Sequence, residues 1–129
     1  MKVRLKFDKN TKSEKYHELF IKFLYYLQGK LPLKKDIDVV FSKDKIGNMT
    51  TGSRHSNGVI YVLASNRLNR DILRTVAHEW IHEYQMNVMG RVKGPDIGGI
   101  NEDEANAFAG RIIKMFERDF PEFESIEYE

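Results

Sequence analysis

The sequence predicts one α+β domain: a small mixed sheet of about four strands, an N-terminal helix, and two further helices after the sheet. Three observations predict this fold class. Short segments of alternating or branched apolar residues lie between residues 3 and 64, and three longer segments carry apolar residues at helical spacing. The 129 residues suffice for one hydrophobic core, and neither a repeat nor a linker divides them.

The first strand and the first helix follow from the spacing of apolar residues. Val3, Leu5 and Phe7 alternate with basic residues, which is the period of a half-buried strand. Over Lys12–Gln28 the apolar residues lie on one helical stripe, and Gly29 ends the predicted helix.

The segments that follow differ in polarity. Ile37–Phe41 is rich in branched residues and predicts a second strand. Ile46–Thr51 is short and polar, so we expect a weak third strand at an edge of the sheet. Ser53–Gly58 has the composition of a turn. Val59–Ala64 is almost entirely apolar, and we expect a strand inside the sheet that is covered on both faces.

Two helices complete the predicted fold. A long helix is expected over residues 71–89, with Trp80 on its buried side. Gly90–Ile100 contains four glycines and a proline and predicts a loop. The last helix begins near Asn101, a residue type that caps helices, and ends near residue 120. Residues 121–129 are acidic, and we expect them to form a mobile tail.

Composition narrows the function. Lys and Arg total 21 against 19 Asp and Glu, a net charge of +2 that does not favour binding to nucleic acid or to a membrane. Because the chain lacks cysteine, only His, Asp and Glu remain as plausible metal ligands. The longest apolar stretch, Leu19–Leu27, is too short to span a membrane, and residues 1–10 are too charged for a signal peptide. We therefore expect a cytoplasmic protein.

The residues His78–His82 form an H-E-x-x-H motif inside the long predicted helix. Four residues make about 1.1 helical turns, so both imidazoles project from one face, about 6 Å apart along the axis. This spacing lets two nitrogen ligands share one zinc ion. Glu79 lies beside the metal position, where a carboxylate can act as a general base. A helix whose histidines merely face solvent is the alternative.

A catalytic zinc ion needs a third protein ligand, and no histidine follows His82. Carboxylates are plentiful at the start of the last helix, where Glu102, Asp103 and Glu104 follow one another. Acidic residues also favour the first turn of a helix for electrostatic reasons alone. The spacing leaves the choice among the three acids open.

The H-E-x-x-H motif followed by the E-x-x-A-N-x-F-A segment over 102–109 resembles the gluzincin metallopeptidases. The ImmA/IrrE-type family and the single-domain minigluzincins are the most similar. The resemblance implies a zincin-like fold, zinc as the cofactor, His78, His82 and Glu102 as its ligands, and Asn106 as a residue that orients a ligand. The chain differs from the ImmA/IrrE-type pattern at the fourth motif position, where Ile81 replaces glycine.

The motif and the resemblance together predict a zinc-dependent endopeptidase that acts on a protein or peptide substrate. A zinc-activated water would hydrolyse the peptide bond, with Glu79 as the general base. We expect the substrate to lie as an extra strand beside Ile46–Thr51. Four residues are candidates to stabilise the oxyanion: His55, Tyr61, Tyr84 and Arg111.

Two other functions are compatible with the motif. One is a catalytically weak or inactive zincin-like protein that acts as a binding or regulatory module, although binding alone does not need a base at Glu79. The other is a DNA-associated SprT-like domain. The absence of a distal histidine and the small net charge count against the SprT-like alternative.

Overall fold

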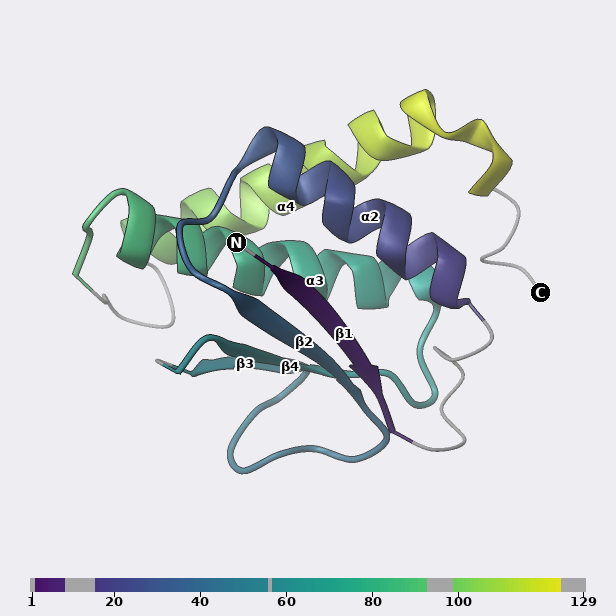
Figure 1. The fold of residues 1–129 in the computed structure, drawn as a ribbon, viewed down its shortest axis with the longest axis horizontal. Helices are drawn as coiled ribbons and strands as arrows, with labels where there is room; N and C mark the ends of the chain where they lie inside the picture. Colours follow the sequence, from purple (N-terminus) through teal and green to yellow (C-terminus); the bar gives the residue numbers. More distant parts are fainter. Residues whose placement is uncertain (1, 9–15, 56, 93–98, 124–129) are drawn as a thin grey trace.

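The computed structural model describes residues 2–8, 16–55, 57–92 and 99–123. In these residues the chain forms a mixed α+β fold with a four-stranded sheet and three α-helices (Figure 1). The predicted fold class is confirmed at this level. Among the described residues, no helix is long and apolar enough to cross a membrane.

The sheet has the strand order β1-β2-β4-β3. Strands β1 (Val3–Phe7), β2 (Ile37–Ser42) and β4 (Val59–Leu63) are parallel, and β3 (Gly52–His55) pairs antiparallel with β4 at the edge. The prediction of a third strand over Ile46–Thr51 was wrong. Residues 46–51 form a loop and turn, and the edge strand is Gly52–His55, where we expected a turn. Pairing with the apolar β4 outweighs the weak strand propensity of the sequence Gly-Ser-Arg-His.

The helices α2, α3 and α4 lie on the same side of the sheet (Figure 1). This arrangement corrects the prediction that β4 is covered on both faces. Ile60 and Val62 are fully buried beneath the helices, whereas Val59, Tyr61 and Leu63 are only half-buried. The alternation follows from the pleat of a strand with one covered face.

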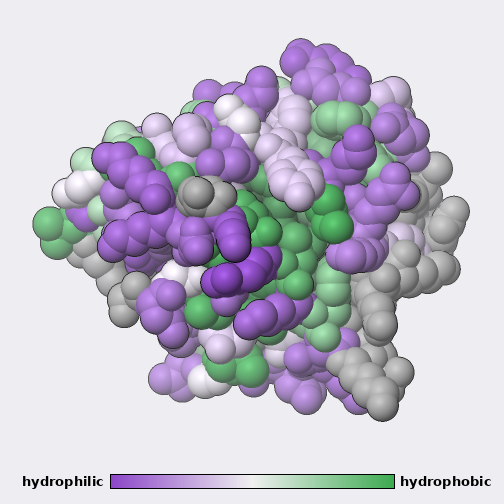
Figure 2. Space-filling view, viewed as in Figure 1, coloured by the Kyte–Doolittle hydropathy of each residue, from purple (hydrophilic) through white to green (hydrophobic). Residues whose placement is uncertain are grey.

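The first helix, α2 (His17–Lys30), buries the predicted apolar stripe of Leu19, Phe20, Phe23, Leu24 and Leu27. The earlier part of the predicted helix includes residues 12–15, which lie outside the described residues. Figure 2 shows apolar surface in the middle of the face where α2 meets β1, with hydrophilic surface around it.

The long predicted helix is α3 (Asn69–Glu83), which continues into the π-helical turn η1 (Tyr84–Val88). Helix α4 (Ile100–Asp119) then returns antiparallel and packs against α3. Gly99 is the N-cap residue of α4, in place of the predicted Asn101. Trp80 is completely buried and donates its indole N–H to the carbonyl of Leu31, which fixes α3 to the segment after α2.

The structure describes the first three residues, 121–123, of the tail predicted over residues 121–129. The ring of Phe123 stacks on Phe116, with 5.9 Å between the ring centroids, so the chain remains packed as far as residue 123. Residues 124–129 lie outside the described residues.

Candidate metal centre

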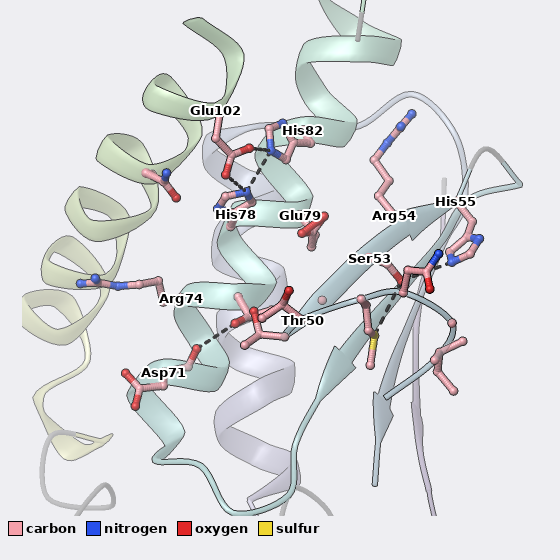
Figure 3. Close-up of a pocket in the computed structure, with 18 of the residues that line it drawn as sticks. Thr50, Ser53, Arg54, His55, Asp71, Arg74, His78, Glu79, His82 and Glu102 are labelled. Atoms are coloured by element: carbon pink, nitrogen blue, oxygen red, sulfur yellow. Dashed lines mark hydrogen bonds and ion pairs between the residues drawn. The ribbon is translucent and has the colours of Figure 1, made fainter. Parts of the chain in front are cut away.

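His78 and His82 project from α3 toward the first turn of α4, where Glu102 faces them (Figure 3). The Nε2 atom of His78 lies 3.0 Å from one oxygen of Glu102, and the Nε2 atom of His82 lies 2.9 Å from the other. The two Nε2 atoms are 2.9 Å apart. These three side chains, predicted as ligands from the sequence, therefore converge on one point and could hold a metal ion.

The hydrogen bonds of Gln85 define the tautomer of His82. Its amide nitrogen donates to the carbonyl of Asn101 and to a carboxylate oxygen of Glu104, each at 3.0 Å. The amide oxygen must therefore be the atom that lies 2.9 Å from Nδ1 of His82. This oxygen only accepts, so Nδ1 of His82 carries the hydrogen and Nε2 is available as a ligand.

The side chains of His78, His82 and Glu102, here called the ligand group, fit a divalent metal ion. The two Nε2 atoms and the carboxylate of this group lie within hydrogen-bonding distance of one another, so a proton or a cation between them would relieve the repulsion of their lone pairs. One proton can join only two of these groups, whereas one cation can bind all three. Tetrahedral zinc with bonds of about 2.0–2.1 Å separates its ligand atoms by about 3.4 Å. The three atoms need to move apart by only a few tenths of an ångström.

The other two acids at the start of α4 are not part of this group. Asp103 is exposed. Glu104 binds Arg91, with N–O distances of 2.8 and 3.2 Å, and accepts the hydrogen bond from Gln85. These contacts, with that from Gln85 the largest, lower the pKa of Glu104. Glu102 is therefore the acid that faces the histidines.

Asn106 lies one turn after Glu102 on α4, and both residues line one open cleft. Within the described part of the chain, it makes no hydrogen bond to the three ligands. Its predicted orienting role stays a prediction. The contact that orients one of the candidate ligands comes from Gln85, a residue not predicted from the sequence. Gln85 is completely buried in η1, and a buried polar residue just after a metal-binding motif is the signal that could have identified it.

Glu79 lies between the ligand group and strand β3 (Figure 3). Burial of its carboxyl group raises the pKa of Glu79, and the adjacent carboxylate of Glu102 acts in the same direction, while the neighbouring histidines act against both. Gly52 of β3 lies directly against it: a Cβ atom at Gly52 would be 3.2 Å from Cγ of Glu79 and 2.6 Å from Cγ2 of Thr75. Because glycine has no side chain, β3 can lie close to α3 at this position.

A buried ion pair supports the same wall of the cleft. Glu83 follows His82 and is only 4% exposed, and it accepts hydrogen bonds from Arg54 of β3 and from Asn87 of η1. The negative charge next to the second histidine is therefore neutralised. The pair also connects the edge strand to the helix that carries both histidines.

His78, Glu79, His82 and Glu102 line a cleft of about 820 Å³ formed by the loop 46–51, β3, one face of α3 and the start of α4. Of the four candidates for oxyanion stabilisation, His55 lines this cleft, and its ring nitrogen lies 3.2 Å from Oγ of Ser53. Tyr61, Tyr84 and Arg111 are not among the cleft-lining residues in the described part of the structure.

Comparisons with protein-family models, curated proteins and solved structures find no match to this chain.

Proposed function

We propose that this chain is a zinc-dependent metallopeptidase of the gluzincin type, with a zincin-like fold, that hydrolyses protein or peptide substrates. One observation carries the proposal: His78, His82 and Glu102 converge from two helices on one point in an open cleft, beside a separate carboxylate. Zinc held there would act as a Lewis acid toward a peptide carbonyl and would lower the pKa of water.

The separate carboxylate, Glu79, has the role of general base in this proposal. It accepts a proton from water as the water oxygen bonds to the carbonyl carbon. When the carbon–nitrogen bond breaks, Glu79 delivers this proton to the leaving amine. Its location in the cleft between the ligand group and β3 supports this role, because a substrate on β3 would pass beside it.

Strand β3 is the proposed docking edge for the substrate, in place of the loop 46–51. The backbone of Thr51 accepts a hydrogen bond from Leu63, and that of His55 accepts one from Gly58. Backbone groups alternate along an antiparallel strand, so those of Gly52 and Arg54 point away from β4. They can pair with an extended peptide, which would then lie along the cleft.

Metal content tests the ligand assignment. The wild type and the Asp103→Ala control, at an exposed neighbouring acid, should each purify with about one zinc ion per chain, and Glu102→Ala should lose most of it. Equal zinc content in Glu102→Ala and Asp103→Ala would contradict the proposed ligand set.

Casein hydrolysis tests the activity. We expect the zinc-loaded wild type to cleave casein and Glu79→Gln to retain zinc but lose cleavage by at least about a hundredfold. A zinc-loaded wild type that binds but does not cut casein or a mixed peptide library would favour the alternative function, a binding or regulatory module.

A further inference from the structure

The cleft that contains the ligand group is lined by three arginines, and two of them are occupied by the protein itself. Arg54 binds the buried carboxylate of Glu83. Arg67 donates hydrogen bonds to the carbonyl oxygens of Leu63 and Asp71, at 2.8 and 3.0 Å. The guanidinium groups of Arg54 and Arg67 are therefore engaged in hydrogen bonds within the protein.

Arg74 is different from these two. It lies on α3, one turn before His78, and is one of the residues that line the cleft; its side chain is exposed and extends toward α4 (Figure 3). It makes no hydrogen bond or ion pair with any residue that the structure describes. An exposed arginine on a helix is commonly just solvated, so its surroundings decide its significance.

The facing surface of α4 leaves room beside this guanidinium. Glu102, Asn106 and Gly110 follow one another at four-residue spacing and share one helical face. A Cβ atom at Gly110 would lie 3.8 Å from Nη2 of Arg74, so the guanidinium lies directly over the position without a side chain. Position 110 therefore offers no side chain that would cover the guanidinium of Arg74.

The position of Arg74 suits contact with a substrate. Four helical residues place its Cα about 6 Å from that of His78 along the helix axis. An extended peptide advances about 3.3 Å per residue, so a residue one or two positions from the cleaved bond can reach the guanidinium. Guanidinium groups bind carboxylates through two parallel hydrogen bonds.

We propose that Arg74 binds a carboxylate of the substrate, so that the protein acts on acidic peptides. This inference rests on the proposed peptidase function and names its substrate class. The carboxylate is either an Asp or Glu side chain near the cleaved bond or the terminus of a short peptide. Arg74 is a residue that determines specificity and has no part in proton transfer.

Cleavage of a complex peptide library, read by mass spectrometry, tests the inference. Wild type should favour Asp or Glu at one fixed position, or cut a fixed distance from free C-termini, which distinguishes the two sources of the carboxylate. Arg74→Gln should lower kcat/KM for these peptides about ten- to a hundredfold. Arg74→Glu should shift the preference to Lys and Arg, and Arg118→Gln, an exposed arginine far along α4, should change nothing.

Binding gives a second measurement that does not depend on cleavage. A fluorescent peptide of alternating Ala and Glu should bind the zinc-loaded Glu79→Gln protein more tightly than its Ala–Gln counterpart, and adding Arg74→Gln should abolish the difference. Cleavage without a preference that responds to Arg74 overturns the inference and leaves the peptidase function intact. Failure to cut any peptide overturns the peptidase function, and the binding difference then decides the inference alone.

Discussion

Replacing Gln85 by Met should weaken zinc binding, although Gln85 does not touch the metal position. The substitution keeps a similar side-chain length and removes three hydrogen bonds, of 2.9, 3.0 and 3.0 Å, at a residue that is 0% exposed. Nδ1 of His82 would lose its acceptor, and the ring would no longer be held in one tautomer and orientation. Loss of such a contact typically costs about 10–100-fold in metal affinity.

Stability should fall as well. Each lost hydrogen bond contributes about 1 kcal/mol, and the groups left behind are buried, so we expect a loss of about 2–4 kcal/mol. Gln28→Met is the matched control, since Gln28 also binds a backbone group through its amide but lies on α2. Zinc affinity is measured by competition with a chromophoric chelator, and stability by urea denaturation of the metal-free protein.

The Gln85→Glu variant separates the effect of Gln85 on the orientation of the His82 ring from its effect on the stability of the fold. Its carboxylate still accepts from Nδ1 of His82, but it also lies against the carboxylate of Glu104 and repels it. We expect this variant to lose stability and to keep zinc affinity close to that of the wild type. The reasoning is refuted if folded Gln85→Met binds zinc as tightly as the wild type, or if Gln85→Glu loses as much affinity as Gln85→Met.

Two further substitutions test contacts that shape the fold around the cleft. Gly52→Ala should destabilise the protein by about 1–3 kcal/mol and reduce kcat more than zinc affinity, because a Cβ atom 2.6 Å from buried Thr75 forces β3 away from α3. Thermal denaturation measures the change in stability, and casein assays measure the change in kcat. Gly29→Ala is the control, because a Cβ atom at Gly29 meets nothing within 4 Å. Burial and a hydrogen bond to Asp119 raise the pKa of Tyr26 to about 12. This neutral phenol therefore stabilises the fold below about pH 10, and the contribution is lost as the pH rises toward 12. Spectrophotometric titration should show one tyrosine ionising late in the wild type and not in Tyr26→Phe, and an unchanged titration in the variant would contradict the assignment.

The sequence predicted the parts of the site that depend on one helix. The spacing of His78 and His82 requires only the regularity of α3, so the two rings could be placed together without knowledge of the fold. The choice of Glu102 over its neighbours depends on how α4 is rotated. That rotation is set by the buried stripe of Ala105, Ala109, Ile112, Ile113 and Phe116. Glu102 lies one turn before Ala105 on this stripe, so it points at α3, and the spacing of the acids alone carried no such information.

The parts that could not be predicted depend on tertiary contacts between distant segments. Strand β3 has a sequence typical of a turn and exists because β4 offers it a partner. Gln85 contacts both His82 and α4 from η1, where the chain leaves regular α-helical geometry, and the sequence does not mark this turn.

The π-helical turn and the ion pair of Glu83 act on the two sides of the same helix end. On one side, Gln85 connects His82 to the start of α4, which carries Glu102. On the other, Glu83 connects the helix to Arg54 and so to the edge strand beside Glu79. Both contacts originate within three residues of His82, and both are buried. The relative placement of the proposed ligands, base and docking edge is therefore fixed largely at the C-terminal end of α3. A substitution there that removes the contact to His82 or to Arg54 should disturb metal affinity and catalysis together, whereas one at Arg74, near the other end of the helix, should change only the choice of substrate.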